Sequence, residues 1–244
     1  MADTRAVAII PARGGSKRIP RKNIRPFLGV PLLVRTIQRL QGISSVSRVV
    51  VSTDDNEIAD IARSAGAEVP FMRPATLADD HASTVPVVRD AVERLAAAGE
   101  TARVMCAVYP AAVLLDTEVL AEAIGIVAQD ATVDFAVPVT SFPSPIQRAM
   151  RRSADGRLEM FQPEHYESRS QDLEPAFHDV GQFYVGSVDA WLHERALFSS
   201  RTHSLVVPRW RVQDIDTPED WTRAEQIAVM LGVVASEHAA GGHA

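Results

Sequence analysis

The chain has a single cysteine among its 244 residues, which excludes an internal disulfide bond. Cys106 lies in the apolar run VMCAVY, which is typical of a small core residue rather than of an exposed nucleophile. Because chains without disulfides are typical of reducing compartments, we expect a cytoplasmic protein.

Long apolar runs are missing as well. No run approaches the ~18 residues that a membrane span requires. The first ten residues, MADTRAVAII, lack the cationic start and the long apolar stretch of a secretory signal. We therefore expect no membrane partner.

Positive charge is scarce over the chain as a whole. There are 25 Lys and Arg against 31 Asp and Glu, so the formal net charge is −6. A general nucleic-acid binder spreads basic charge over a face, and we therefore expect no nucleic-acid partner. The 46% hydrophobic content predicts an ordinary globular chain, with one domain over residues 1–244.

Standard phosphate and metal motifs are absent. The chain has no G-x-x-x-x-G-K-[ST] loop and no G-x-G-x-x-G loop. None of its seven histidines forms a spacing such as H-x-x-x-H with a third partner. A nucleotide or metal site must therefore use other residues.

The chain does contain an alternation of buried strands and amphipathic helices. Five short apolar runs predict strands of a sheet that is buried on both faces, at 6–11, 47–53, 103–110, 133–140 and 180–187. Helical spacing predicts helices after Asp54, from about Thr84, over 119–127 and after the cap Thr217. For the first of these we expect Asp54 to be the cap, with Glu57 three residues later. The alternation predicts an α/β fold with a mostly parallel, doubly wound, Rossmann-like sheet.

The alternation of predicted strands and helices stops between about residues 142 and 179. This segment is polar, contains prolines and has no long helical period, so we expect an inserted hairpin or arm. Arms of this kind often make contacts between subunits, and we expect a homodimer. Residues 235–244, ASEHAAGGHA, are expected to form a frayed tail.

Positive charge is concentrated in the loop after the first predicted strand. From Ala12 to Arg25 there are six cations and no acid. Gly14 and Gly15 allow backbone N–H groups to approach a phosphate, and Arg13 and Lys17 can neutralise it. The outer cations also fit an ordinary solvated surface; they are Arg18, Arg21, Lys22 and Arg25.

The stretch IIPARGGSKRIPRKNI resembles the signature loop of the CMP-sugar synthetases, the cytidylyltransferases that activate sialic acid and its relatives. The resemblance covers nearly the whole chain. RPATLADDHAST resembles a second family segment, in which an arginine lies near the cytosine, and RVQDIDTPEDW resembles a late acidic motif that holds magnesium. SPIQRA, RSQDLE and HDVGQFY look most like the pseudaminic acid cytidylyltransferase branch.

The resemblance implies two sets of binding residues. Those expected at the nucleotide are Ala12, Arg13, Gly14, Gly15, Ser16, Lys17, Asn23, Arg73, Asp80 and Ser83. Those expected at the sugar are Tyr109, Gln147, Arg169, Gln171, His178, Gln182, Phe183 and Tyr184. Arg169 is our choice for the sugar carboxylate, because a guanidinium binds a carboxylate in bidentate fashion. For His178 a structural hydrogen bond is an equal alternative.

Asp214 and Asp216 flank Ile215, so in an extended segment both carboxylates point the same way. Two hard oxygen ligands beside bound phosphates suit Mg²⁺. The alternative from spacing alone is that Asp216 caps the last helix and Asp214 is exposed. With the resemblance, we expect both to bind metal and, with Arg13 and Lys17, to form the catalytic set.

The implied reaction is nucleotidyl transfer, in which a nine-carbon 2-keto acid attacks CTP and pyrophosphate leaves. We expect pseudaminic acid as the acceptor, with CMP-N-acetylneuraminate or CMP-legionaminate synthesis as the alternative. A nucleotide-sugar glycosyltransferase would share the fold and a D-x-D motif, and a non-catalytic nucleotide sensor is a further possibility. Release of pyrophosphate in step with sugar consumption separates these three classes.

Overall fold

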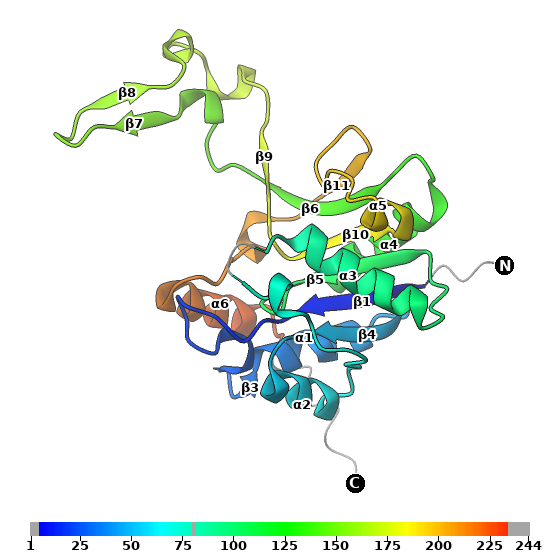
Figure 1. Cartoon of the computed structure of the whole chain (residues 1–244). Helices are drawn as coiled ribbons and strands as arrows, with labels where there is room; N and C mark the ends of the chain where they lie inside the picture. The colour runs from blue at the N-terminus through cyan, green and yellow to red at the C-terminus, as the bar shows by residue number, and fades with distance from the viewer. Residues whose placement is uncertain (1–4, 80–81, 234–244) are drawn as a thin grey trace.

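A seven-stranded sheet forms the centre of the protein, which the computed structural model describes over residues 5–79 and 82–233 (Figure 1). Its strand order is β11-β6-β10-β5-β1-β4, and β9 pairs with β6. These strands are β1 Ala6–Pro11, β4 Val46–Ser52, β5 Val104–Val108, β6 Phe135–Ser141, β9 Phe177–Asp179, β10 Phe183–Ser187 and β11 Thr202–Val206. The five predicted strands are thus confirmed, and β9 and β11 are additional.

Most of the sheet is parallel, as predicted. β1 pairs in parallel with β4 and β5, and β11 pairs in parallel with β6. β9 and β10 are the exceptions: β10 runs antiparallel to both of its neighbours, β5 and β6, and β9 runs antiparallel to β6. The reversal follows from the insertion after β6, which carries the chain away from the sheet and returns it in the opposite direction as β9 and β10.

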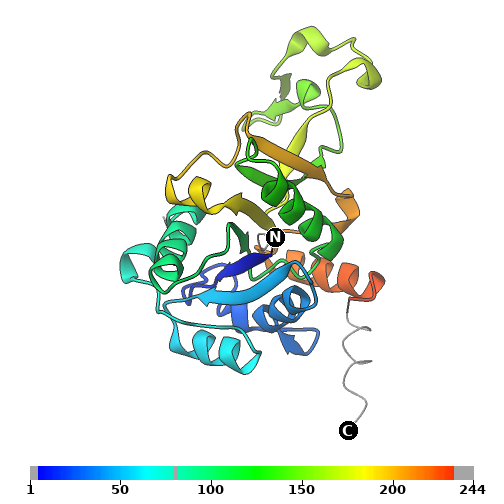
Figure 2. The ribbon, with the colours of Figure 1, turned by 90° about the vertical axis from the view of Figure 1, so that its right-hand side faces the viewer.

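Helices cover both faces of this sheet (Figure 2). They are α1 Leu32–Gln41, α2 Asn56–Ser64, α3 Thr84–Ala97, α4 Thr117–Gln129, α5 Val188–Leu192 and α6 Pro218–Met230. Short 3₁₀ turns occupy Lys22–Ile24, Ala75–Leu77, Ile146–Arg148, Pro163–His165, Ser170–Asp172 and Arg209–Arg211. The predicted helices α2, α3, α4 and α6 are confirmed, whereas the sequence analysis did not identify α1 and α5.

Two hydrophobic layers explain why the strands are apolar at nearly every position. Along β1, Ala8 and Ile10 pack with α1, α2 and α4, whereas Val7 and Ile9 pack with α3 and α5 on the other face. Successive side chains of a strand point to opposite faces, so a strand covered on both sides needs a continuous apolar run. A third cluster joins α6 to the small β2–β3 hairpin, Pro26–Phe27 and Val30–Pro31, through Phe27 and Trp221.

Of the two neighbouring acids before α2, Asp54 and Asp55, one caps the helix. The side chain of Asp55, not that of Asp54, accepts the main-chain N–H of Ile58 and caps α2, so the expected Asp54 cap is wrong. The cap of α6 is the predicted Thr217, in a reciprocal capping box with Asp220. No helix within residues 5–79 and 82–233 has the length and apolar character needed to cross a membrane.

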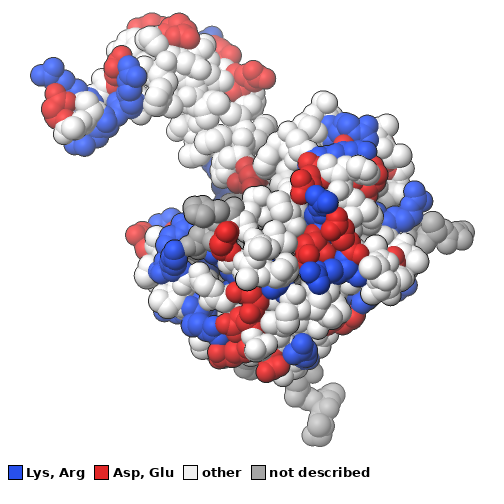
Figure 3. Space-filling view, viewed as in Figure 1, with Lys and Arg blue, Asp and Glu red and all other residues white. Residues whose placement is uncertain are grey.

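The insertion after β6 forms an arm that projects from the sheet (Figure 1). Its tip is the antiparallel hairpin of β7 Met150–Arg152 and β8 Leu158–Met160. Many of its large apolar side chains are exposed, namely Phe142, Ile146, Met150, Leu158, Phe161, Tyr166 and Phe177. Uncharged side chains cover the middle of the arm, and charged ones gather toward its hairpin end (Figure 3). The expected tail at 235–244 lies outside the described residues.

Candidate active site

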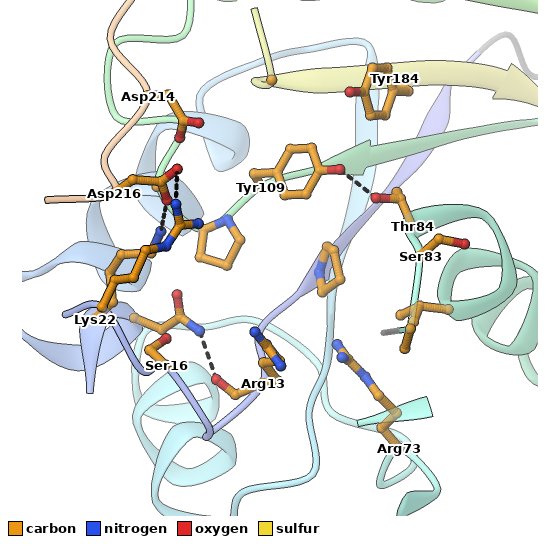
Figure 4. A pocket seen from close by; sticks show the side chains of 18 of the residues that line it. Arg13, Ser16, Lys22, Arg73, Ser83, Thr84, Tyr109, Tyr184, Asp214 and Asp216 are labelled. Carbon is orange, nitrogen blue, oxygen red and sulfur yellow. Dashed lines mark hydrogen bonds and ion pairs between the residues drawn. The ribbon is translucent and has the colours of Figure 1, made fainter. Parts of the chain in front are cut away.

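A cavity of about 430 Å³ opens at the carboxyl edge of the parallel strands. It is lined by residues that follow β1 and β5, by the start of α3, by the β9–β10 connection and by the segment before α6. In an open α/β sheet this edge is where ligands bind, because the loops after successive strands meet there. Figure 4 shows the side chains that point into this cavity.

The loop after β1 contributes Arg13 and Ser16 to the cavity, and Lys17 to a small extension of it. The buried side chain of Asn23 donates to the main-chain oxygen of Arg13 at 2.9 Å and holds the loop against the turn that follows. Ala12 is fully buried, and its N–H donates to Ser52 O on β4. Ala12 therefore supports the loop without lining the cavity, whereas Asn23 both holds the loop and lines the cavity.

The two glycines of the loop differ. The Gly14 N–H donates to Asp54 Oδ1 at 3.0 Å, so this amide binds a carboxylate of the protein rather than facing the cavity. A Cβ at Gly14 would lie 2.6 Å from Asp55 Oδ2, whereas a Cβ at Gly15 would meet no atom within 4 Å. The expectation that the Gly14 amide cradles a phosphate is corrected: Gly14 is needed for the close approach of the loop to α2.

The outer cations divide into two pairs. Arg18 and Lys22 line the cavity, and their nitrogens lie 2.7 and 3.6 Å from the carboxylate oxygens of Asp216. Arg21 instead binds Asp55 and Glu57 at the start of α2, and Arg25 lies over the Trp221 ring. Arg18 and Lys22 thus line the cavity, Lys22 as a largely buried side chain and Arg18 as one that is 70% exposed to solvent.

Arg73 and Ser83 lie at the far side of the cavity from the aspartates (Figure 4). Arg73 is only 6% exposed, and its guanidinium donates to the main-chain and side-chain oxygens of Ser52. Burial lowers the pKa of Arg73 to about 10, which leaves it protonated at neutral pH. Thr84, next to Ser83, also lines the cavity. Asp80 lies outside the described residues.

Asp214 and Asp216 both face the cavity, while Ile215 between them is fully buried. Burial, together with the charge of Asp216, raises the pKa of Asp214 above its ordinary value. Asp216 does not cap α6, since Thr217 does, so that half of the alternative is wrong. Asp214 is exposed, as the alternative expected, but its side chain lines the cavity. Two adjacent carboxylates beside a phosphate loop fit Mg²⁺, which takes its other ligands from phosphate and water. The described residues contain no cluster of three or more His, Cys, Asp or Glu that could hold a metal alone.

A polar wall built on two tyrosines lies opposite the loop cations (Figure 4). The hydroxyl of Tyr109, after β5, shares a hydrogen bond with Thr84 Oγ1, and its ring packs edge-on against Tyr184 at 5.9 Å between centroids. The Tyr184 hydroxyl donates to Asp179 Oδ2. Burial raises the pKa of both tyrosines, so both hydroxyls remain protonated at neutral pH.

Other residues expected at the sugar do not line this cavity. Phe183 lies in the hydrophobic layer on the opposite face from Tyr184, as strand alternation requires. Gln182 is buried, and its amide donates to Arg211 O. His178 Nδ1 donates to the main-chain oxygen of Asp179 at 2.9 Å, and its ring packs on Phe142. This geometry favours the structural alternative for His178.

Three of the expected sugar residues lie on the projecting arm. Gln147 donates to Glu174 O, and Arg169 pairs with Asp172 at 3.0 Å. Gln171 is exposed in a neighbouring 3₁₀ turn. None of the three is among the residues that line the described cavity of their own chain.

The cavity also contains residues that the sequence analysis did not select. They are Pro11, Ala82, Thr84, Val87, Pro110, Ala111, Asp179 and Gly181, beside Arg18 and Lys22. Thr84 could have been found from its place beside Ser83 at the start of a helix. Asp179 had a weaker signal, namely an acid just before a glycine where the arm rejoins the sheet.

Comparison with known proteins shows which family the chain is similar to. A family model described as cytidylyltransferase matches residues 7–169. The chain is 43% identical over 214 residues to a pseudaminic acid cytidylyltransferase of Campylobacter jejuni subsp. jejuni serotype O:2, covering 88% of this chain and 92% of the relative. It is 30% identical to a CMP-N,N'-diacetyllegionaminic acid synthase of Legionella pneumophila subsp. pneumophila, covering 91% and 96%.

A solved structure has the same fold. It is a CMP:2-keto-3-deoxy-manno-octonic acid synthetase complexed with CTP, with a TM-score of 0.68 and 17% identity. The match covers 93% of this chain and 99% of that one. The family model spans more than half of the chain, and the Campylobacter relative is aligned over nearly its whole length. The chain therefore belongs to the cytidylyltransferase family of nucleotide-transferring enzymes.

Proposed function

We propose that this enzyme transfers the CMP group of CTP to pseudaminic acid and releases pyrophosphate. The observation that carries the proposal is the 43% identity to a pseudaminic acid cytidylyltransferase over 88% of the chain. The cavity supports the same reaction, since it joins four cations, two adjacent carboxylates and a hydroxyl-lined wall. The chemistry is attack of the anomeric hydroxyl on the α-phosphorus, with cleavage of the bond to the pyrophosphate oxygen.

The loop cations have the role of binding the triphosphate. Arg13, Lys17, Arg18 and Lys22 surround one end of the cavity, where a nucleotide carries about four negative charges. Nucleotidyl transfer depends mainly on positioning and charge neutralisation, which fixed cations supply without reorganisation. Arg73 and Ser83, at the other side, would then face the cytidine.

Magnesium is the cofactor that we propose, held by Asp214 and Asp216. When bound, Mg²⁺ neutralises charge on phosphate oxygens and favours deprotonation of the attacking hydroxyl. The pKa of Asp214 is raised first by burial and second by the charge of Asp216, and a cation bound between the two carboxylates would offset both effects. Arg18 and Lys22 supply part of this compensation through Asp216.

The acceptor site is proposed to include residues from a second copy of the chain. Arg169, Gln147 and Gln171 lie on an arm that projects from its own sheet and exposes many large apolar side chains. A homodimer in which this arm covers the partner's cavity would bury these side chains and bring Arg169 to the sugar carboxylate. We also propose a cytoplasmic location, since the single cysteine is a buried free thiol.

The preference for pseudaminic acid over N-acetylneuraminic acid is proposed to arise at the wall of the cavity. Pseudaminic acid has a second acetamido group and a terminal methyl where sialic acid has a hydroxylated chain. Ala111, Val87 and the Tyr184 ring offer apolar surface there, whereas Phe183, which the sequence suggested, lies in the hydrophobic core. Unpaired hydroxyls of the wrong sugar would cost roughly 1–3 kcal/mol each.

The test is pyrophosphate release with CTP, Mg²⁺ and a panel of nonulosonic acids. We expect kcat/KM for pseudaminic acid to exceed that for N-acetylneuraminic and legionaminic acids by tenfold or more. Equal or better use of either of the other acids would overturn the acceptor assignment and leave the reaction class intact. If none of the acids gives pyrophosphate, the proposed function itself is wrong.

A further inference from the structure

An irregular strand pairing brings an acid to the sugar side of the cavity. Val139 of β6 lies opposite Asp179, while Ala136 lies opposite Val185. Between these two pairs the chain advances by three residues on β6 but by six on the returning segment, so the returning segment has three extra residues. The extra residues form a bulge between β9 and β10, with Gly181 at φ +62°. Bulges change the direction of side chains at the ends of strands, and this one leaves Asp179 and Gly181 in the cavity wall.

Two donors fix the carboxylate of Asp179. The Tyr184 hydroxyl donates to Oδ2, and the Gly181 N–H donates to Oδ1 at 3.0 Å. A carboxylate can accept about four hydrogen bonds, two at each oxygen. Each oxygen of Asp179 therefore retains the capacity to accept one more hydrogen bond from a ligand in the cavity.

The charges around the cavity decide which groups of a ligand can approach the Asp179 carboxylate. Arg13 and Lys22 lie on the loop side of the cavity, and the two tyrosines lie on the opposite wall (Figure 4). Asp179 belongs to that wall, because it binds the Tyr184 hydroxyl and lines the cavity. The carboxylate group of a sugar-acid acceptor would be repelled by Asp179 and is therefore directed away from it. An N–H group, in contrast, finds there an acceptor that cannot itself act as a donor.

We propose that Asp179 is a specificity-determining residue that accepts a hydrogen bond from an acylamino N–H of the sugar acceptor. The inference rests on the proposed function, because it concerns the acceptor of that reaction. Tyr184 has a positioning role, since its hydroxyl holds the carboxylate while its ring packs on Tyr109. The class of ligand recognised is an N-acylated 2-keto sugar acid, with its carboxylate directed away from Asp179.

The experiment compares two acceptors in the full-length enzyme, by pyrophosphate release at saturating CTP and Mg²⁺. One is pseudaminic acid; the other is 2-keto-3-deoxynonulosonic acid, which has hydroxyl in place of acylamino groups. A hydroxyl can accept from an Asn amide, but an amide N–H cannot. Asp179→Asn should therefore lower kcat/KM for pseudaminic acid on the order of 10- to 100-fold. It should change kcat/KM for the hydroxyl acceptor by less than about threefold, and the KM for CTP by less than about twofold.

Two further variants separate this effect from a structural one. Tyr184→Phe keeps the carboxylate and removes one of its two donors, so we expect a loss in the same direction but smaller than that of Asp179→Asn. Asp60→Asn removes an exposed carboxylate on α2 and should leave both acceptors unchanged. Equal losses for the two acceptors in Asp179→Asn, or no loss for either, would overturn the inference. Failure of the unsubstituted enzyme with every acceptor would instead overturn the proposed function.

Discussion

The cations of the loop after β1 have different partners, and substituting them should therefore have different effects on CTP binding. Arg13→Ala and Lys17→Ala should each raise the KM for CTP by about tenfold or more, because a hydrogen bond to a charged phosphate is lost. The matched control is Arg21→Ala, since Arg21 belongs to the same loop but binds Asp55 and Glu57. It should change the KM for CTP by less than about threefold. Steady-state kinetics with each substrate varied decide the matter, and a loss confined to the KM of the sugar would contradict the assignment.

The two aspartates before α6 give a second test at the level of residues. Asp214→Asn and Asp216→Asn should each lower kcat on the order of 100-fold or more at saturating Mg²⁺, since charge neutralisation contributes several kcal/mol to such a transfer. Circular dichroism should show an unchanged fold. Glu219→Gln is the control, because Glu219 is an exposed acid of the adjacent helix. A near-normal kcat in either aspartate variant would remove that residue from the proposed metal site.

The sequence predicted some residues of the site and not others, for a physical reason. Arg13, Lys17 and the aspartate pair are recognisable locally, because their charges stand together in the chain. Arg18 and Lys22 were ambiguous, since their partner Asp216 lies almost 200 residues away and only the fold brings it near. Phe183 was assigned wrongly although strand alternation should have placed it opposite Tyr184.

Among the elements, α2 allows the contribution of an ion pair to stability to be measured separately from that of a helix cap. Asp55 caps the helix and binds Arg21, and the hydrogen bond from Arg21 holds the pKa of Asp55 below its ordinary value. An acid with a lowered pKa in the folded state stabilises the protein above its unfolded pKa of about 4, and this contribution is lost as the pH falls through the folded value. Asn can also cap a helix, so Asp55→Asn removes mainly the charge.

We therefore expect Asp55→Asn to lower the free energy of unfolding by about 1 kcal/mol at pH 7. The difference from the unsubstituted protein should shrink below about pH 4. Ser187→Ala removes the cap of α5, which involves no carboxylate, and should give a loss that does not change with pH. Urea unfolding between pH 3 and 7 provides the measurement. A pH-independent loss in Asp55→Asn would show that the ion pair contributes nothing.

The elements that the sequence did not predict fall into two kinds. α1 had a usable signal, because Leu33, Ile37 and Leu40 follow a helical spacing and all are buried. β11 had almost none: it is an edge strand in which Leu205 is buried while its neighbours on either side are exposed. Short edge strands take their structure from pairing with β6 rather than from their own composition.

For the whole molecule, the exposed arm predicts self-association. Light scattering at micromolar concentration should give twice the chain mass of 26.5 kDa. Leu158→Lys together with Phe161→Lys should produce monomers, because both side chains are more than 60% exposed apolar surface that a partner would bury.

The monomeric variant should also lose sugar use more than CTP use. Arg169 lies on the arm, whereas the loop cations belong to the sheet, so the KM for the sugar should rise while the KM for CTP stays within about threefold. Arg195→Lys, a conservative change on the body of the protein, should leave the mass and both KM values unaltered. A monomeric unsubstituted protein, or a monomer variant with normal sugar kinetics, would contradict the arrangement.

The late position of β10 in the chain has a consequence for synthesis on the ribosome. β4, β1 and β5 are complete by residue 108, and β6 follows by residue 141, yet β10, which joins the two groups in the sheet, ends at residue 187. A nascent chain can therefore form its first βα units early, but it has an unpaired edge at β5 until the arm has been made and β10 has emerged. Asp214 and Asp216 emerge later still. The lining of the cavity is thus complete only once residue 216 has emerged, and a chain that stops before residue 183 lacks Tyr184 and both aspartates.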